Sequence, residues 1–200
     1  SVGGAPEPNP FLGYRSLRIL LEHDEILGPH VRAILRALKD SPGRILVPMV
    51  GGPEDVRAVR ERLLAERKSL PPVDAMVEVP SALFRLEEVA RASDFLSIGT
   101  NDLTQHVLGV DRTNARVARF FDHCQPAVLR AVASIVRAGR AAKKPVGVCG
   151  GMASDPLFLP LWVGLGVDWI SVHVARIGPL RARLAATPVR ESRALVRQLL

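Results

Sequence analysis

Four polar side chains of this sequence each follow a short apolar run, and their types suit the binding of ions or the movement of a proton. They are Glu78, Asn101, Asp102 and Cys149. Apolar runs of this length, separated by helix-like segments, are typical of parallel strands that are buried on both faces. The carboxyl ends of parallel strands meet at one edge of a sheet, so we expect these four groups to converge there.

Glu78 and Asp102 are the candidate metal ligands, because they follow neighbouring predicted strands. Mg²⁺ takes oxygen ligands, usually one or two carboxylates together with waters and a substrate phosphate. The alternative for Glu78 is a solvent-facing strand end. A carboxylate that closes an otherwise apolar run needs a partner, which favours the metal interpretation.

The other candidates have simpler alternatives that the residues alone leave open. Asn101 next to Asp102 is also a common turn and helix N-cap pair. Cys149 could act as a general acid, but a buried structural thiol is the more common case. Arg15 and Arg112 could clamp a carboxylate or phosphate with their guanidinium groups, although most arginines are surface residues.

Turn residues and hydrophobic periodicity place these groups on a chain of alternating strands and helices. Strands are expected at 45–49, 75–79, 94–98, 146–149 and 169–172. Helices are expected at 14–38 with a break near Gly28-Pro29, at 54–68, at 82–91, from Pro126, at 155–164, and in the tail from about Pro179. The pattern predicts one α/β domain over residues 1–200, with about five βα units behind a leader at 1–8.

Composition and charge narrow the class of protein. Apolar residues make up 48% of the chain and aromatic residues only 4%, which suits an aliphatic α/β interior better than a surface that stacks on nucleic-acid bases. The net charge is +7, but arginines alternate with acidic residues along helix-like segments such as 54–62, as on a solvated helix face. We therefore expect no nucleic-acid partner.

Targeting signals and cysteine usage bear on the compartment. No apolar run reaches the ~18 residues of a membrane helix, and the start of the chain lacks the basic and apolar regions of a signal peptide. Cys124 and Cys149 have no metal-ligand spacing and make no disulfide framework. These features predict a cytoplasmic protein without a membrane segment.

Several motifs occur in an order that resembles a known family. Through most of residues 9–175 the chain resembles the C-terminal, phosphoenolpyruvate-binding domain of enzyme I of the bacterial phosphotransferase system. Tyr14, residues 78–81 and residues 159–166 resemble the nitrogen-related paralogue. The matching motifs are Asn9-Pro10-Phe11-Leu12-Gly13-Tyr14-Arg15, Met76-Val77-Glu78-Val79-Pro80-Ser81, Ser97-Ile98-Gly99-Thr100-Asn101-Asp102-Leu103-Thr104-Gln105, Val110-Asp111-Arg112 and Val148-Cys149-Gly150.

The resemblance implies a (β/α)₈ TIM barrel, a homodimer, and a phosphoryl transfer from phosphoenolpyruvate. The phosphoryl group would pass to a histidine on a separate N-terminal domain and then to a small, HPr-like carrier protein. By motif match, Mg²⁺ would be held by Glu78 and Asp102, phosphoenolpyruvate by Arg15, Asn101 and Arg112, and the proton at the enolpyruvate methylene carbon would be exchanged by Cys149.

Three departures from the family pattern limit what the resemblance implies. The family barrel has eight strands where five βα units are visible, no phosphohistidine domain is present, and Gly151 stands where the family usually has glutamate. The chain therefore resembles a fragment that would be inactive alone. Two functions stay open: the phosphoenolpyruvate-binding and Mg²⁺-binding part of a phosphotransferase of sugar transport or nitrogen regulation, or a degenerate, regulatory or dimerisation module that binds without turnover.

Overall fold

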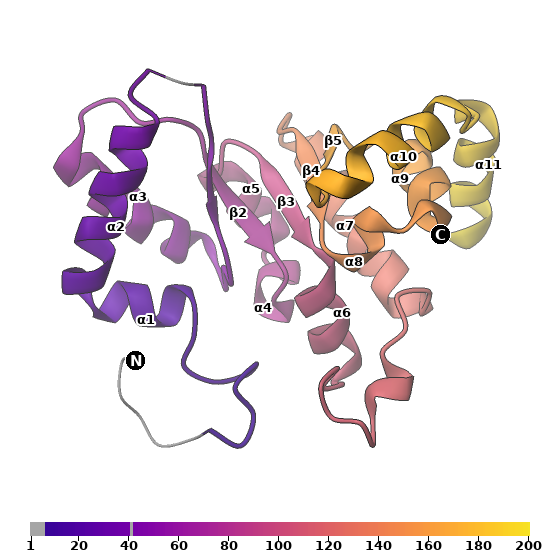
Figure 1. Ribbon diagram of the computed structural model, residues 1–200, viewed down its shortest axis with the longest axis horizontal. Coiled ribbons are helices and arrows are strands. Elements are labelled where there is room, and N and C mark those ends of the chain that lie inside the picture. Colours follow the sequence, from indigo (N-terminus) through magenta and orange to yellow (C-terminus); the bar gives the residue numbers. More distant parts are fainter. Residues whose placement is uncertain (1–6, 41) are drawn as a thin grey trace.

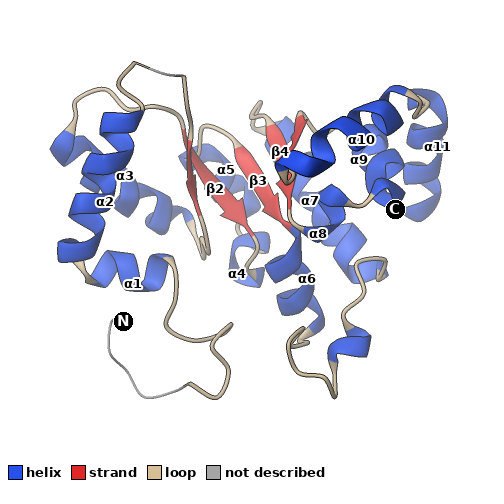
Figure 2. Ribbon diagram, in the orientation of Figure 1, coloured by secondary structure: helices blue, strands red, loops and turns tan. Residues whose placement is uncertain are grey.

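Five parallel strands form one sheet in the order β1-β2-β3-β4-β5 (Figures 1 and 2). The computed structural model describes residues 7–40 and 42–200, so most of the expected leader lies outside the described residues. The strands are β1 (Ile45–Val47), β2 (Val73–Val77), β3 (Leu96–Gly99), β4 (Val146–Cys149) and β5 (Trp169–Ile170). Strand order follows chain order, as expected when each strand is followed by a crossover and then by its parallel neighbour.

Helices connect the strands and follow the last one. They are α1 (Leu17–Glu22), α2 (Asp24–Ala37), α3 (Pro53–Glu66), α4 (Pro80–Leu83), α5 (Leu86–Ala92), α6 (Thr100–Leu108), α7 (Pro126–Ala141), α8 (Gly151–Ser154), α9 (Leu159–Leu165), α10 (Val174–Ala185) and α11 (Val189–Leu199), with short 3₁₀ turns at Ala118–Phe120 and Pro156–Phe158. The arrowheads of β2 and β3 point toward α4 and α6, which marks the carboxyl edge of the sheet in Figure 1.

The two faces of the sheet differ in chemistry, because alternate residues of a strand point to opposite sides. Ala75, Ile98 and Val148 are fully buried in the aliphatic core, where α3 packs on β2 and α7 packs on β3 and β4. The other face holds a row of residues paired across four strands: Met76, Ser97, Gly147 and Trp169. A Cβ on Gly147 would lie 2.0 Å from the Trp169 ring, so this position has no room for a side chain.

Local structure corrects several predicted boundaries. The expected break near Gly28-Pro29 is wrong: Pro29 lies inside α2, and the chain breaks at His23 instead. His23 has non-helical angles, its ring contacts Glu25, and Asp24 and Glu25 favour the helix start that follows. The last helical region starts at Val174 rather than near Pro179, and the helix expected at 155–164 is a 3₁₀ turn at Pro156–Phe158 followed by α9.

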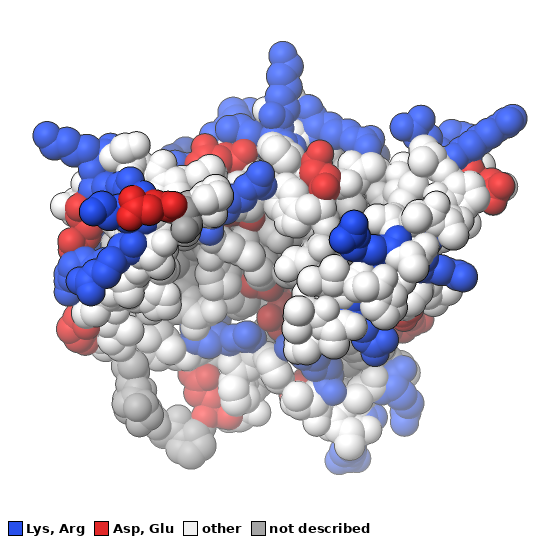
Figure 3. All heavy atoms as spheres, turned by 45° about the horizontal axis from the view of Figure 1, so that its top comes forward, with Lys and Arg blue, Asp and Glu red and all other residues white. Residues whose placement is uncertain are grey.

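Surface charge is scattered rather than gathered in one band. In Figure 3, Lys and Arg side chains are interrupted by acidic and uncharged surface. Several basic groups form ion pairs between elements, such as Arg62 with Asp24 and Arg85 with Glu54, and Arg91 forms an i,i+4 pair with Glu87 within α5. None of the helices that the structure describes is both long and apolar enough to cross a membrane.

Candidate active site

Glu78 directly follows β2 at the carboxyl edge of the sheet. Its side chain is buried, and its Oε1 accepts the backbone N–H of Met49, from the loop after β1, at 2.8 Å. The Nδ1 atom of His106, on α6, lies 2.8 Å from the Glu78 carbonyl oxygen. Contacts from the loop after β1 and from α6 therefore fix both the carboxylate and the backbone of Glu78.

Asp102 lies in the first turn of α6, which begins immediately after β3. Its carboxylate is nearly buried and faces two guanidinium groups: Arg112 Nη1 lies 3.2 Å from Oδ1, and Arg15 Nη2 lies 3.5 Å from Oδ2. Arg15 comes from the segment before α1, 87 residues away in the sequence. Residues from distant parts of the chain thus meet at this edge.

Phe11 connects the two arginines. The guanidinium carbon of Arg112 lies 4.8 Å from the centre of the Phe11 ring, and that of Arg15 lies 5.2 Å from it. Cation–π contacts of this kind orient the planar guanidinium groups over the ring. Sequence reasoning did not single out Phe11 as a site residue, although it lies within the 9–15 motif.

The electrostatics of Glu78 reflect its crowded position. Burial, followed by repulsion from Asp102, raises the pKa of Glu78 to about 7, while the Met49 N–H and the arginines act in the opposite direction. The contribution from Asp102 is that of a second carboxylate at the same edge of the sheet. Glu78 is therefore a group whose charge changes near neutral pH.

Asn101 links the turn after β3 to the turn after β4. Its Oδ1 accepts the backbone N–H of Gly151 at 2.8 Å, which leaves the side-chain NH₂ free to donate elsewhere. The Thr100 hydroxyl donates to the Cys149 carbonyl at 2.8 Å. Gly150, with φ of 93°, has a Cβ position only 2.4 Å from the Thr100 hydroxyl oxygen, so glycine is required where the two turns touch.

Cys149 is half-buried at the end of β4. Its thiol donates to the Ile98 carbonyl at 3.5 Å, and the Ser97 hydroxyl donates to its Sγ at 4.0 Å. Burial raises the pKa of the Cys149 thiol; the Ser97 hydrogen bond lowers it, and nearby Glu78 and Asp74 raise it further. A thiol in this setting stays protonated at neutral pH and can act as a proton donor.

His123 is a residue at the edge of the site that the sequence motifs do not single out. It lies in the loop before α7, with its Nδ1 2.7 Å from the Thr104 hydroxyl and its ring against Phe121 and Phe158. A Cβ on Gly151 would lie 3.1 Å from its Nε2. Burial lowers the pKa of His123, so the imidazole is neutral at neutral pH. The helix-starting Pro126 was the available signal that His123 precedes the helix.

Glu78 and Asp102 are the candidate ligands of a divalent cation. Within the described ranges there is no cluster of three or more His, Cys, Asp or Glu side chains arranged for a metal. Glu78 and Asp102 still supply two oxygen donors, the number that Mg²⁺ often takes from a protein. Asp102 Oδ1 is buried; it forms the ion pair with Arg112 but accepts no hydrogen bond with good geometry from the described residues. Two carboxylates, one of them with a buried oxygen that makes no hydrogen bond, are the kind of donors that suit a hard cation.

Comparison with known proteins identifies the family. The model of the PEP-utilising enzyme, PEP-binding domain matches residues 3–189, and the chain belongs to this family, whose ligand is phosphoenolpyruvate (PEP). The chain is 39% identical over 202 residues to multiphosphoryl transfer protein 2 of Escherichia coli (strain K12), across 96% of this chain and 24% of that protein. It is 35% identical over 204 residues to the phosphoenolpyruvate-protein phosphotransferase of Bacillus subtilis (strain 168), across 97% of this chain and 36% of that protein.

A solved structure supports the same fold. A citrate lyase from Burkholderia xenovorans LB400 matches with a TM-score of 0.60 and 27% identity, over 78% of this chain and 53% of that chain. Together with the five parallel strands, this likeness confirms the predicted TIM-barrel family and the partial barrel. The chain spans only about a quarter to a third of the two curated relatives described above.

Proposed function

We propose that this chain is the PEP-binding and Mg²⁺-binding part of a phosphoenolpyruvate-protein phosphotransferase. The observation that carries the proposal is the meeting of Glu78, Asp102 and two arginines at one edge of the sheet. PEP presents a phosphate and a carboxylate, the two groups that guanidinium forks match. Asn101, next to Asp102, contributes an amide donor to the same edge.

The ion pairs at Asp102 support an exchange of partners on ligand binding. Asp102 is paired with Arg15 and Arg112 in this structure. A bound Mg²⁺ would be held by Glu78 and Asp102 and would neutralise charge on the substrate phosphate. The arginines, released from Asp102, would then bind the phosphate and carboxylate of PEP.

Cys149 supplies the proton that makes the reaction hard to reverse. The bond between phosphorus and the enol oxygen breaks, a phosphorus–nitrogen bond forms on a histidine of another domain, and enolpyruvate is left. The protonated Cys149 thiol gives its proton to the methylene carbon, which forms pyruvate. Its raised pKa supports the protonated form at neutral pH.

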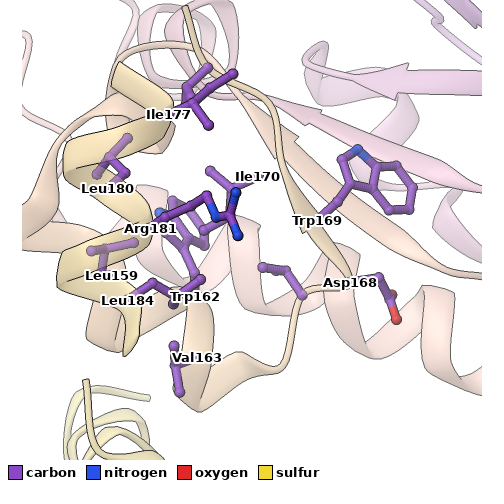
Figure 4. Close-up of a pocket in the computed structure, with 12 residues that line it drawn as sticks. Leu159, Trp162, Val163, Asp168, Trp169, Ile170, Ile177, Leu180, Arg181 and Leu184 are labelled. Carbon is purple, nitrogen blue, oxygen red and sulfur yellow. The ribbon is translucent and has the colours of Figure 1, made fainter. Parts of the chain in front are cut away.

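The partners and the remaining domains belong to the same proposal. An N-terminal phosphohistidine domain would receive the phosphoryl group and an HPr-like carrier protein would accept it, in the cytoplasm and in a homodimer. Residues 1–200 would form the C-terminal part of a barrel whose first strands pair with the open edges β1 and β5. An apolar groove of about 220 Å³ between α9, β5 and α10 would take part of those strands (Figure 4).

One observation favours a second function, a regulatory or dimerisation module without turnover. Gly151 stands at the rim beside Asn101 and His123, where the resembled family usually has a carboxylate. A site that lacks this group could bind PEP and report its level without completing the transfer.

Calorimetry of PEP binding tests the proposal. We expect the chain to bind PEP only with Mg²⁺, and weakly, because Arg15, Asn101, Arg112 and the metal alone would hold its phosphate and carboxylate, and each charge-assisted contact that is not made costs ~1.5–3 kcal/mol. Glu78→Gln should remove the Mg²⁺ dependence, whereas Glu61→Gln, on exposed α3 surface, should not. PEP binding that is unaffected by both Mg²⁺ and Glu78→Gln would refute the assignment.

A further inference from the structure

Asp74 is a fully buried carboxyl group without a partner. It lies in the middle of β2, its exposed fraction is 0%, and neither carboxyl oxygen has a hydrogen-bond partner among residues 7–40 and 42–200. Burying an ionised carboxylate without a partner is strongly unfavourable, so such a group takes up a proton instead. Unsatisfied buried groups are rare in folded proteins, and this one has no role in the site described above.

The charges around Asp74 leave it protonated. Burial raises the pKa of Asp74 to about 9; the Ala75 N–H and Arg44 oppose the change, and Asp94 adds to it. Arg44 makes no ion pair with Asp74, because its guanidinium lies 4.7 Å from the Phe95 ring centre and 4.8 Å from that of Trp169. At neutral pH Asp74 is therefore an acid that still holds its proton.

Asp74 faces the same side of the sheet as Cys149, with Ser97 between them. Asp74 and Met76 point to one face of β2, and Met76 is paired with Ser97 across the strands. The Ser97 hydroxyl donates to Cys149 Sγ at 4.0 Å. Asp74 is close enough to the thiol for its charge to raise the pKa of Cys149. The three groups thus form a polar line through an otherwise apolar sheet.

We propose that Asp74 returns a proton to Cys149 through Ser97 after each turnover. This inference rests on the proposed function. Once Cys149 has protonated enolpyruvate, its thiolate takes the Ser97 hydroxyl proton while Ser97 takes the proton of Asp74. One S–H bond forms, the O–H bond of Asp74 breaks, and the Asp74 carboxylate regains a proton from solvent before the next cycle. Asp74 and Ser97 share no direct hydrogen bond, so a bridging water or a side-chain rotation completes the path.

Asp74 acts through Cys149 and does not touch the substrate, so it is a positioning residue. Its role is tested by measuring proton exchange rather than turnover alone. In D₂O with Mg²⁺, exchange of the pyruvate methyl protons is followed by proton NMR on the full chain. We expect Cys149→Ala to abolish exchange, and Asp74→Asn and Ser97→Ala each to slow it about ten- to a hundredfold. Glu61→Gln should exchange at the wild-type rate.

The outcomes separate this inference from the proposed function. Exchange that depends on Cys149 but is unchanged in Asp74→Asn would overturn the relay and leave the proposed function standing. A wild-type chain that exchanges no faster than pyruvate in buffer would overturn the relay, while the proposed function is decided separately by the calorimetry of PEP and Mg²⁺ binding. Asn is isosteric with the protonated Asp74 side chain, so thermal unfolding close to that of the wild type should accompany a slow Asp74→Asn variant.

Thiol reactivity gives a readout that does not need turnover. In a Cys124→Ser background, the pH dependence of Cys149 alkylation by iodoacetamide reports the thiol pKa. Asp74 becomes negatively charged as the pH passes about 9, so we expect Asp74→Asn to lower the thiol pKa by removing that charge. We expect Ser97→Ala to raise the thiol pKa by removing a hydrogen bond to the thiolate. Identical profiles in the three proteins would show that Asp74 is a structural residue without access to Cys149.

Discussion

Cys149 is the residue whose substitution should lower turnover without weakening ligand binding. Its thiol contacts the Ile98 carbonyl and the Ser97 hydroxyl, whereas the arginines that would hold the anion contact Asp102. In the full-length protein we expect Cys149→Ala to keep PEP and Mg²⁺ binding but to lower turnover ~10²–10⁴-fold, the range of a positioned general acid. The rate of pyruvate release measures this loss.

The second cysteine provides the control. Cys124 is exposed in the loop before α7, and Cys124→Ala should turn over at the wild-type rate. If Cys149→Ala also keeps the wild-type rate, the Cys149 thiol is a packing residue and another group protonates enolpyruvate.

Glu78 should make the stability of the metal-free protein depend on pH. In the folded state its pKa is about 7, raised from 4.5 by burial and by Asp102. The folded state therefore holds this proton more tightly than the unfolded chain. The resulting stabilisation is fully present below about pH 4 and is lost as the pH rises through 7.

The isosteric amide should remove this dependence. Between about pH 4.5 and 7, the free energy of unfolding of the wild type should fall relative to that of Glu78→Gln, with a slope of up to about 1.4 kcal/mol per pH unit. Urea unfolding at a series of pH values measures the difference, and Glu61→Gln should follow the wild type. A difference that does not change with pH would mean that Glu78 ionises normally in the folded protein.

Among the elements, α9 and α11 pack so closely that a glycine is required. A Cβ on Gly164 of α9 would lie 2.3 Å from the Ser192 carbonyl oxygen and 2.6 Å from a Val196 methyl group. Gly164→Ala should destabilise the protein by about 1–3 kcal/mol through this overpacking, although alanine favours a helix by about 1 kcal/mol. Urea denaturation gives the change.

Gly178 is the matched control for this helix pair. It lies in α10, and nothing approaches its Cβ position within 4 Å. Gly178→Ala should therefore leave stability unchanged or raise it slightly. Equal effects of the two substitutions would mean that the contact between α9 and α11 relaxes without loss.

At the scale of the whole molecule, the open sheet leaves apolar surface uncovered. β1 and β5 each have one neighbour in the sheet, and Leu46 and Ile177 are 40% and 44% exposed. Unpaired strand edges beside apolar surface favour association with another chain. We expect this chain to self-associate in a concentration-dependent way, as measured by sedimentation velocity.

A charge in the groove should weaken that association. Ile177 lines the groove between β5 and α10, so Ile177→Asp should shift the protein toward monomer (Figure 4). Leu157→Asp changes an exposed leucine on a different element and should leave the association unchanged. A wild-type chain that stays monomeric at high concentration would show that the exposed edges are protected in some other way.

The sequence determined the type and order of the elements, because strand and helix periodicity is local. Apolar runs such as 146–149 became parallel strands, and Glu78 and Asp102 followed their strands to one edge. The helix break near Pro29 was predicted wrongly. Pro29 lies inside α2, where packing of the buried Leu27, Val31 and Leu35 overrides the local effect of the proline, and the polar residues at 23–25 fix the real start.

Tertiary structure decided which groups face one another. Periodicity cannot show that Arg15 meets Asp102 across 87 residues, that Phe11 stacks under two arginines, or that His123 turns inward from its loop. It also cannot show that Asp74 lacks a partner, because burial and pairing depend on every element packed around a residue. Which residues meet across long stretches of sequence depends on how the whole chain folds, and these contacts determine the protonation of the groups in this site.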